Sequence, residues 1–118
     1  DRQKTSTPLQ SLVLLNDPQY LEAAKILALK AIKSVQEDQI QYVFKSLINR
    51  IPSDEELSIL QELRIQELDE FETHPLRIKA LLNIGERRID ESKETAQLAS
   101  LMIVASTIMN YDEFVLKT

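Results

Sequence analysis

Apolar residues recur every three or four positions along most of the chain, which is the spacing of an amphipathic α-helix. Six segments show this pattern: residues 8–15, 18–35, 38–49, 54–73, 75–84 and 92–109. No stretch alternates apolar and polar residues between turn signals, as a half-buried strand does. The pattern therefore predicts an all-α fold, a compact bundle of five or six helices around a buried C-terminal helix, with no sheet.

Local signals mark the ends of several predicted helices. Thr7-Pro8 and Asp17-Pro18 each place an N-cap residue before a proline at the first helical position, where the missing N–H is tolerated. Ser53 and Glu56 have the spacing of a capping box, in which each side chain accepts a hydrogen bond from the other residue's backbone N–H. Gly85 is placed to end the helix before it in the left-handed conformation.

The helix predicted over residues 18–35 has a continuous apolar face. That face comprises Tyr20, Leu21, Ala24, Leu27, Ala28, Ala31, Ile32 and Val35. The charged residues are assigned mostly to the opposite side: Glu22, Lys25, Lys30 and Lys33. The pattern predicts a helix that packs its apolar face on the core and turns its charges to solvent.

The last predicted helix differs from the others, because residues 95–111 contain no charge. Polar residues such as Gln97 and Ser100 interrupt the run, whereas a membrane span needs about 20 mostly apolar residues. We expect instead a central helix, buried on most of its circumference. Its hydroxyl groups are expected to bond back to the preceding turn, although the same residues could line a ligand cavity.

Two similar stretches, LLNDPQYL and IMNYDEFV, follow apolar helical patterns. Asparagine tolerates the left-handed conformation better than most residues, and its amide can bond to nearby backbone groups. We therefore interpret Asn16 and Asn110 as helix ends. Tyr20 and Phe114, four residues after each, are expected to dock into the same core.

The composition of the chain excludes several kinds of partner and of metal or haem site. The 118 residues fit a single domain, residues 1–118, and the net charge of −5 argues against nucleic acid or an anionic membrane surface as a partner. The absence of cysteine excludes thiolate metal sites and covalent haem attachment within this chain. The chain begins with Asp1 rather than methionine, so we expect it to be a piece excised from a longer protein.

Few side chains are candidates for chemistry. His74, the only histidine, precedes a proline in a predicted turn, so an exposed loop residue is favoured over a catalytic base. The acids at 54–56 suit a helix N-terminus, where negative charge is stabilised. Asp112 and Glu113 could ligate a hard cation, but two adjacent acids fall far short of the six or more oxygens that such an ion takes. We predict no catalytic, cofactor-binding or metal-binding residue in this domain.

Four motifs run through the chain: TPLQSLVLLNDP at 7–18, RIPSDEE at 50–56, Gly85, and MNYDEF at 109–114. Together they resemble the C-terminal part of a planctomycete-type bacterial domain of unknown function, found at the end of secreted multidomain proteins with cytochrome c-like domains. The resemblance implies an extracytoplasmic location, in the periplasm or at the cell surface. It also implies a haem elsewhere in the parent protein, and it implies no established activity.

Three functions remain open at this point. The leading hypothesis is a non-catalytic structural or interaction domain of a larger exported bacterial protein, which contacts other domains of the same chain or a protein partner. The second is a redox- or polysaccharide-related extracytoplasmic enzyme, to whose shared site Asp17, Asp112 or Glu113 contributes a carboxylate. The third is an independent helical adaptor, which predicts a large exposed apolar patch. The candidate interaction residues are Thr7, Pro8, Gln10, Asn16, Asp17, Pro18, Asn110, Asp112, Glu113 and Phe114.

Overall fold

The computed structural model describes the backbone of residues 18–34, 38–83 and 95–115, and the side chains of residues 21–33, 38–83 and 95–110. These residues form five helices and no strand, which confirms the predicted all-α fold. The helices are α2 (Pro18–Ser34), α3 (Gln39–Ile48), α4 (Asp54–Thr73), α5 (Pro75–Leu82) and α6 (Ala96–Val115). The helix predicted over residues 8–15 and the turn at Gly85 lie outside the described residues.

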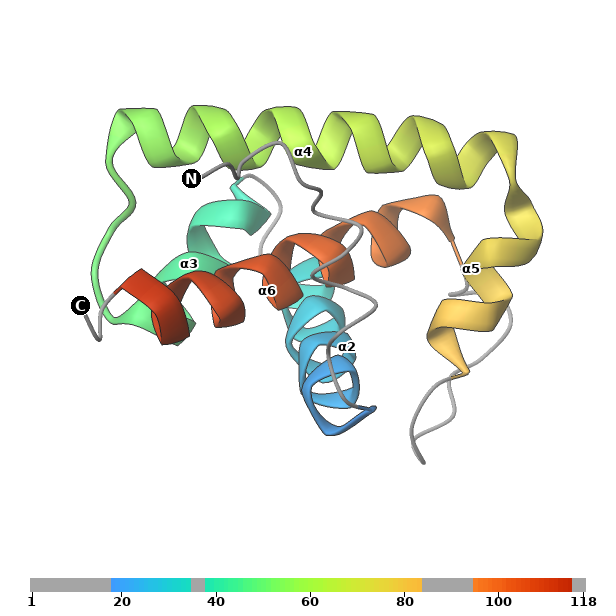
Figure 1. The fold of residues 1–118 in the computed structure, drawn as a ribbon, viewed down its shortest axis with the longest axis horizontal. Helices are drawn as coiled ribbons and strands as arrows, with labels where there is room; N and C mark the ends of the chain where they lie inside the picture. The colour runs from blue at the N-terminus through green and yellow to red at the C-terminus, as the bar shows by residue number, and fades with distance from the viewer. Residues whose placement is uncertain (1–17, 35–37, 84–94, 116–118) are drawn as a thin grey trace.

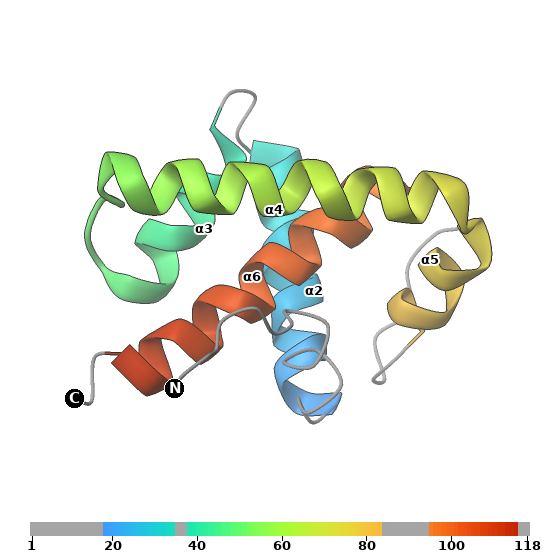
Figure 2. The ribbon, with the colours of Figure 1, turned by 45° about the horizontal axis from the view of Figure 1, so that its top comes forward.

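Helix α6 lies across the middle of the molecule and packs against each of the other four described helices. Figure 1 shows α4 along one long edge, with α5 turning back at its end and α2 crossing on the other side of α6. In the view of Figure 2, α2 passes behind α4 and α6. The most apolar segment of the chain is therefore enclosed, because helices meet it on several sides.

The burial of α6 follows from this central position. Every residue from Leu98 to Ser106 is buried, with no polar stripe of the kind that a surface helix carries. The Ser100 hydroxyl donates to the Gln97 carbonyl oxygen at 3.0 Å, and the Thr107 hydroxyl donates to the Ile103 carbonyl oxygen at 2.9 Å. The structure thus confirms both the buried central helix and the hydroxyl groups that bond back to the preceding turn.

The capping box that starts α4 is present as predicted. The Glu56 backbone N–H donates to the Ser53 hydroxyl oxygen at 3.1 Å, and the Ser53 N–H donates to the Glu56 carboxylate at 2.9 Å. Arg50 adds two hydrogen bonds to the same carboxylate, each of 2.9 Å. Helix α4 then runs to Thr73, and α5 starts with Pro75 at its first position. The local sequence signals therefore predicted this helix and its limits correctly.

The interpretation of Asn110 as a helix end is wrong, because α6 continues to Val115. The side-chain amide of Asn110 donates to the Ser106 carbonyl oxygen at 2.9 Å, so it is satisfied inside the helix. Neither glycine nor proline follows Asn110, so nothing in the chain stops the helix there. Asn16 and the side chains of Tyr20 and Phe114 lie outside the described residues.

Asn49 has the conformation that was predicted for Asn110. It ends α3 with a φ of 70°, and its backbone N–H donates to the Lys45 carbonyl oxygen at 2.9 Å. Pro52 follows shortly afterwards and cannot donate a backbone hydrogen bond to continue the helix. Asparagine therefore replaces glycine at this helix end, where the chain needs a left-handed residue.

We expect Asn49→Ala to lower the free energy of unfolding by about 1 kcal/mol, since the alanine Cβ disfavours the left-handed conformation. Asn49→Gly should leave stability close to that of the parent chain, because glycine adopts this conformation freely. The control is Asn83→Ala, at a helix end where φ is −95°. Urea denaturation followed by circular dichroism measures all three. Equal effects of alanine at the two positions would contradict the role of the backbone conformation.

The position of Lys25 corrects the assignment of charges on α2. Its side chain is fully buried, and its ammonium group donates to the Leu82 carbonyl oxygen at 2.9 Å, at the end of α5. Lys25 lies four residues after Leu21 and three before Ala28, both of which are buried, so all three share one helix face. Lys30 and Lys33 are exposed, as predicted.

Candidate interaction surface

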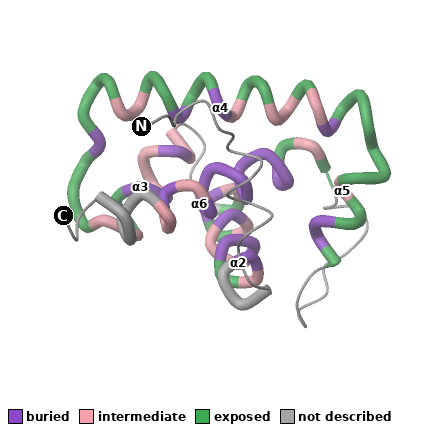
Figure 3. The backbone as a smooth tube through the Cα atoms, in the orientation of Figure 1, coloured by how far each residue is buried: buried purple, intermediate pink, exposed green. Residues whose placement is uncertain are grey.

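Helix α4 packs on the rest of the molecule along one side only. Its residues Leu60, Leu63 and Phe71 are buried, and they recur at the spacing of a single helix face. Figure 3 shows buried and intermediate positions on the side of α4 that faces the other helices and exposed positions along its outer side. The outer side of α4 therefore meets no other described helix.

The charge on α4 has one dominant sign. The helix contains one basic residue, Arg64, and eight acids: Asp54, Glu55, Glu56, Glu62, Glu67, Asp69, Glu70 and Glu72. Its net charge of −7 exceeds the −5 of the whole chain, so the remaining residues together carry +2. The acidic character of this protein is thus concentrated on one helix.

Three of these acids form a straight row on the outer side. Glu55, Glu62 and Asp69 follow one another at intervals of seven residues, which is almost two helical turns and about 10.5 Å of helix length. All three are exposed, and none forms an ion pair with a described residue. The row therefore presents three carboxylates without counter-charges in the described part of the chain.

Two exposed isoleucines flank this row. Ile59 is 60% exposed and Ile65 is 67% exposed, although isoleucine is usually buried. Ile59 follows Glu55 by four residues and Ile65 follows Glu62 by three, so the helical rotation puts them on opposite sides of the row. We call Glu55, Ile59, Glu62, Ile65 and Asp69 the acidic face.

Some of the other acids of α4 make contacts within the fold. Glu56 caps the helix, and Glu70 pairs with Arg77 at 2.7 Å. Partial burial raises the pKa of the Glu67 carboxyl; the charge of Arg77 opposes this rise, and the charge of Glu70 adds to it. Glu56 and Glu70 are thus engaged in a cap and an ion pair, and Glu67 is half-buried, whereas Asp54 and Glu72 are exposed like the acids of the acidic face.

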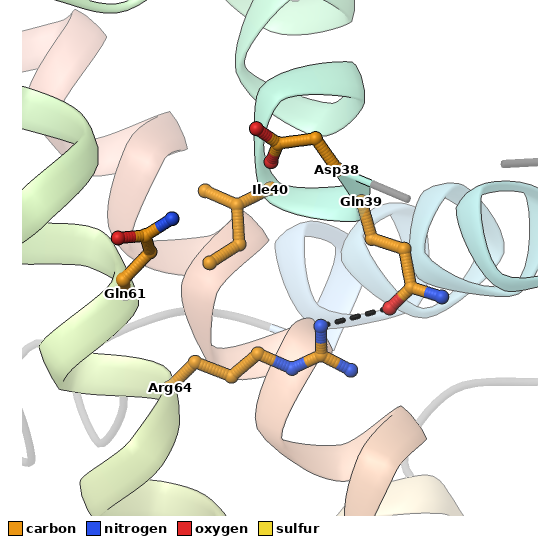
Figure 4. A pocket seen from close by; sticks show the side chains of 5 residues that line it. All are labelled: Asp38, Gln39, Ile40, Gln61 and Arg64. Atoms are coloured by element: carbon orange, nitrogen blue, oxygen red, sulfur yellow. Dashed lines mark hydrogen bonds between the residues drawn. The ribbon is translucent and has the colours of Figure 1, made fainter. Parts of the chain in front are cut away.

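A pocket open to solvent, with a volume of about 440 Å³, lies where α4 meets the start of α3. Figure 4 shows Arg64 reaching across it toward Gln39. The pocket is lined by Asp38, Gln39, Ile40, Gln61 and Arg64.

The Arg64 guanidinium is held by neutral oxygens of α3 and α6. It donates to the Gln39 amide oxygen at 2.8 Å and to the Ser100 hydroxyl at 3.3 Å. It also donates to the Gln97 backbone and side-chain oxygens, at 3.2 and 3.0 Å. Burial lowers the pKa of Arg64, which nevertheless stays charged, as arginine does in proteins. Since Arg64 joins three helices through these bonds, its evident role is to position them.

The structure does not test whether the sequence-predicted interaction residues come together, because most of them or their side chains lie outside the described residues. Thr7, Pro8, Gln10, Asn16 and Asp17 lie outside the described residues. Pro18 begins α2, and Asn110 lies inside α6. Asp112, Glu113 and Phe114 belong to the last turns of α6, but their side chains are outside the described set. These predictions, including the shared enzyme site, remain untested.

The acidic face was missed by the sequence reasoning, although a signal existed. Acids at seven-residue intervals can be read directly from DEELSILQELRIQELDEFET. The sequence alone does not show which of the acids lie on the outer side of α4, because this depends on which side of the helix packs.

Two kinds of feature are absent from the described residues. Three or more histidine, aspartate or glutamate side chains do not gather there as a metal site would require. No helix among them has both the length and the apolarity to cross a membrane. His74 is exposed, with its ring nitrogen 3.5 Å from the Glu70 carboxylate, which matches the expected loop residue.

Comparison with known proteins places the chain in a family. A family model named PSD1, described as "Protein of unknown function (DUF1553)", matches residues 1–64, more than half of the 118 residues. No curated protein and no solved structure matches the chain. The match covers α2, α3 and the first half of α4, where the capping box and the first two acids of the row lie. The chain belongs to the PSD1 family of proteins of unknown function (DUF1553).

Proposed function

We propose that this chain is a non-catalytic structural and interaction domain of a larger exported bacterial protein, and that the acidic face of α4 is the surface it presents. The one-sided packing of α4 carries this proposal. A 20-residue helix lies along an edge of the molecule and exposes two isoleucines among carboxylates without counter-charges among the described residues.

Such a surface has a reason to be covered. Full burial of an isoleucine side chain provides roughly 1.5–3 kcal/mol. Ile59 and Ile65, which are 60% and 67% exposed, lack more than half of that stabilisation. Like charges along one helix side also repel one another weakly. A partner that supplies apolar contacts and positive charge removes both penalties. Nucleic acid and anionic lipid have the wrong sign to be this partner. The partner in this proposal is another domain of the same parent protein.

The proposed export and the larger parent rest on the resemblance of the four sequence motifs to domains at the end of secreted proteins with cytochrome c-like domains. Membership of the PSD1 family is consistent with that origin and adds no activity. A haem belongs to another domain of the parent in this proposal, because the chain has no cysteine for covalent attachment.

A thiol-protection experiment tests the interaction function. The chain contains no cysteine, so Glu62→Cys introduces one thiol on the acidic face, and Lys45→Cys introduces one at an exposed position of α3. Each variant is labelled with a maleimide, once as the 118-residue chain and once within the full-length protein from the encoding bacterium.

We expect both thiols to react at similar rates in the chain alone. In the full-length protein, the thiol at position 62 should react at least about tenfold more slowly than the thiol at position 45, because a bound partner surface covers it. Equal rates in the full-length protein would remove the acidic face from the proposal. Immunodetection in cell fractions tests the remainder: a band no larger than 13.6 kDa, or one confined to the cytoplasm, would contradict a larger exported protein.

A further inference from the structure

The spacing within the acidic face points to the kind of partner that it receives. Resting on the proposed function, we infer that the face binds an amphipathic helix with lysine or arginine at seven-residue intervals, flanked by apolar residues. Glu55, Glu62 and Asp69 define a row of three negative charges about 21 Å long. A partner helix laid along α4 places its own side chains, seven residues apart, on one face at the same interval. Each carboxylate of the row therefore meets one cation.

An extended segment does not match this row. Side chains on one side of a strand repeat every two residues, at roughly 6.8 Å, so successive cations fall out of step with carboxylates about 10.5 Å apart. A flexible loop could reach the three acids only by ordering many side chains, which opposes binding. The match of repeat lengths therefore favours a helix.

The occupant is not a second copy of this chain. Two acidic faces placed together would bring six unpaired carboxylates into contact, which is unfavourable. The chain also offers no complementary element, since no two of its 14 lysine and arginine residues stand seven positions apart. In line with the proposed function, the partner helix therefore lies in another region of the parent protein.

The flanking isoleucines supply the apolar part of the contact. Ile59 and Ile65 lie on the two sides of the acidic row, so a helix seated on that row touches both of them. Charge complementarity then sets the register, and burial of the isoleucines adds affinity. This arrangement resembles a helix seated on a surface through regularly spaced anchors.

Two synthetic helical peptides of equal composition test the inference. One carries three lysines at seven-residue intervals between leucine and alanine, and the other carries the same three lysines at five-residue intervals, which scatters them around the helix. Binding of each labelled peptide to the 118-residue protein is measured by fluorescence anisotropy at low ionic strength. We expect the peptide with lysines at seven-residue intervals to bind at least about tenfold more tightly than the other peptide, because only its lysines form one row.

Two charge variants locate the site. Glu62→Gln with Asp69→Asn removes two members of the row. We expect this double variant to bind the peptide with lysines at seven-residue intervals about tenfold more weakly. Asp54→Asn with Glu72→Gln removes the same charge from exposed positions of α4 outside the acidic face, and it should change the affinity less than about twofold. Circular dichroism checks that both variants keep their helix content.

The outcomes separate this inference from the proposed function. Equal binding of the two peptides, or equal effects of the two double variants, would show attraction to any polycation and overturn the helical partner. If the thiol at position 62 were still protected in the full-length protein, the interaction function would stand with a partner of another shape. If that thiol were unprotected, the proposed function would fail on its own measurement.

Discussion

Leu101→Ala is expected to lower the free energy of unfolding by about 3–4 kcal/mol, the largest effect among the substitutions considered. Leu101 is 0% exposed and lies within the buried run of α6, the helix that contacts all four other described helices. Truncation removes three carbon atoms and leaves a cavity at a place where close packing limits collapse. Urea denaturation followed by circular dichroism gives the change in free energy.

Leu76→Ala is the matched control for this prediction. Leu76 is 83% exposed on α5, so its truncation should change stability by less than about 0.5 kcal/mol. A similar loss at both positions would mean that α6 is not the centre of the core. A small loss at both would mean that the helices around Leu101 are loosely packed.

Lys25→Met is expected to have the second-largest effect and to lower the free energy of unfolding by about 2 kcal/mol. Methionine preserves most of the volume of the lysine stem but removes the ammonium donor, which leaves the Leu82 carbonyl oxygen without this bond in a buried place. Because that bond ties α2 to the end of α5, backbone amides of α5 should also exchange with solvent faster in the variant. Hydrogen exchange detected by mass spectrometry measures this second effect.

Lys33→Met, an exposed position in the last turn of the same helix, serves as the control. We expect this substitution to lower the free energy of unfolding by only a few tenths of a kcal/mol, because it removes a cation near a helix C-terminus. Should Lys25→Met be neutral or stabilising, the buried ammonium would be replaceable by an apolar group, as some buried ionic groups are. The bond to Leu82 would then have no net role in stability.

The contrast between Asn49 and Asn110 shows why one helix end was predictable and the other was not. Both residues follow apolar helical patterns, and an isolated asparagine is compatible with a left-handed end or with helix continuation. At Asn49 the nearby Pro52 stops the helix. At Asn110 the amide bonds to Ser106, and the residues that follow propagate the helix. The decisive information lay in the neighbouring residues rather than in the asparagine itself.

Lys25 illustrates a different limit. Its angular position already placed it beside Leu21 and Ala28, yet a charged residue is rarely buried, so it was assigned to the solvent side. Only the tertiary structure supplies its partner, because the Leu82 carbonyl lies 57 residues away in the sequence. A long-range acceptor of this kind has no local pattern that could reveal it.

The sequence by itself determined the fold class, the capping box at Ser53 and the burial of the uncharged C-terminal helix. These features depend on interactions between residues a few positions apart, or on the apolar content of one segment. The tertiary structure alone decided which side of α4 is covered, where the ammonium of Lys25 finds its acceptor, and which helices Arg64 joins. Those features depend on contacts between distant segments, and the acidic face became visible only when packing had removed the opposite side of α4 from solvent.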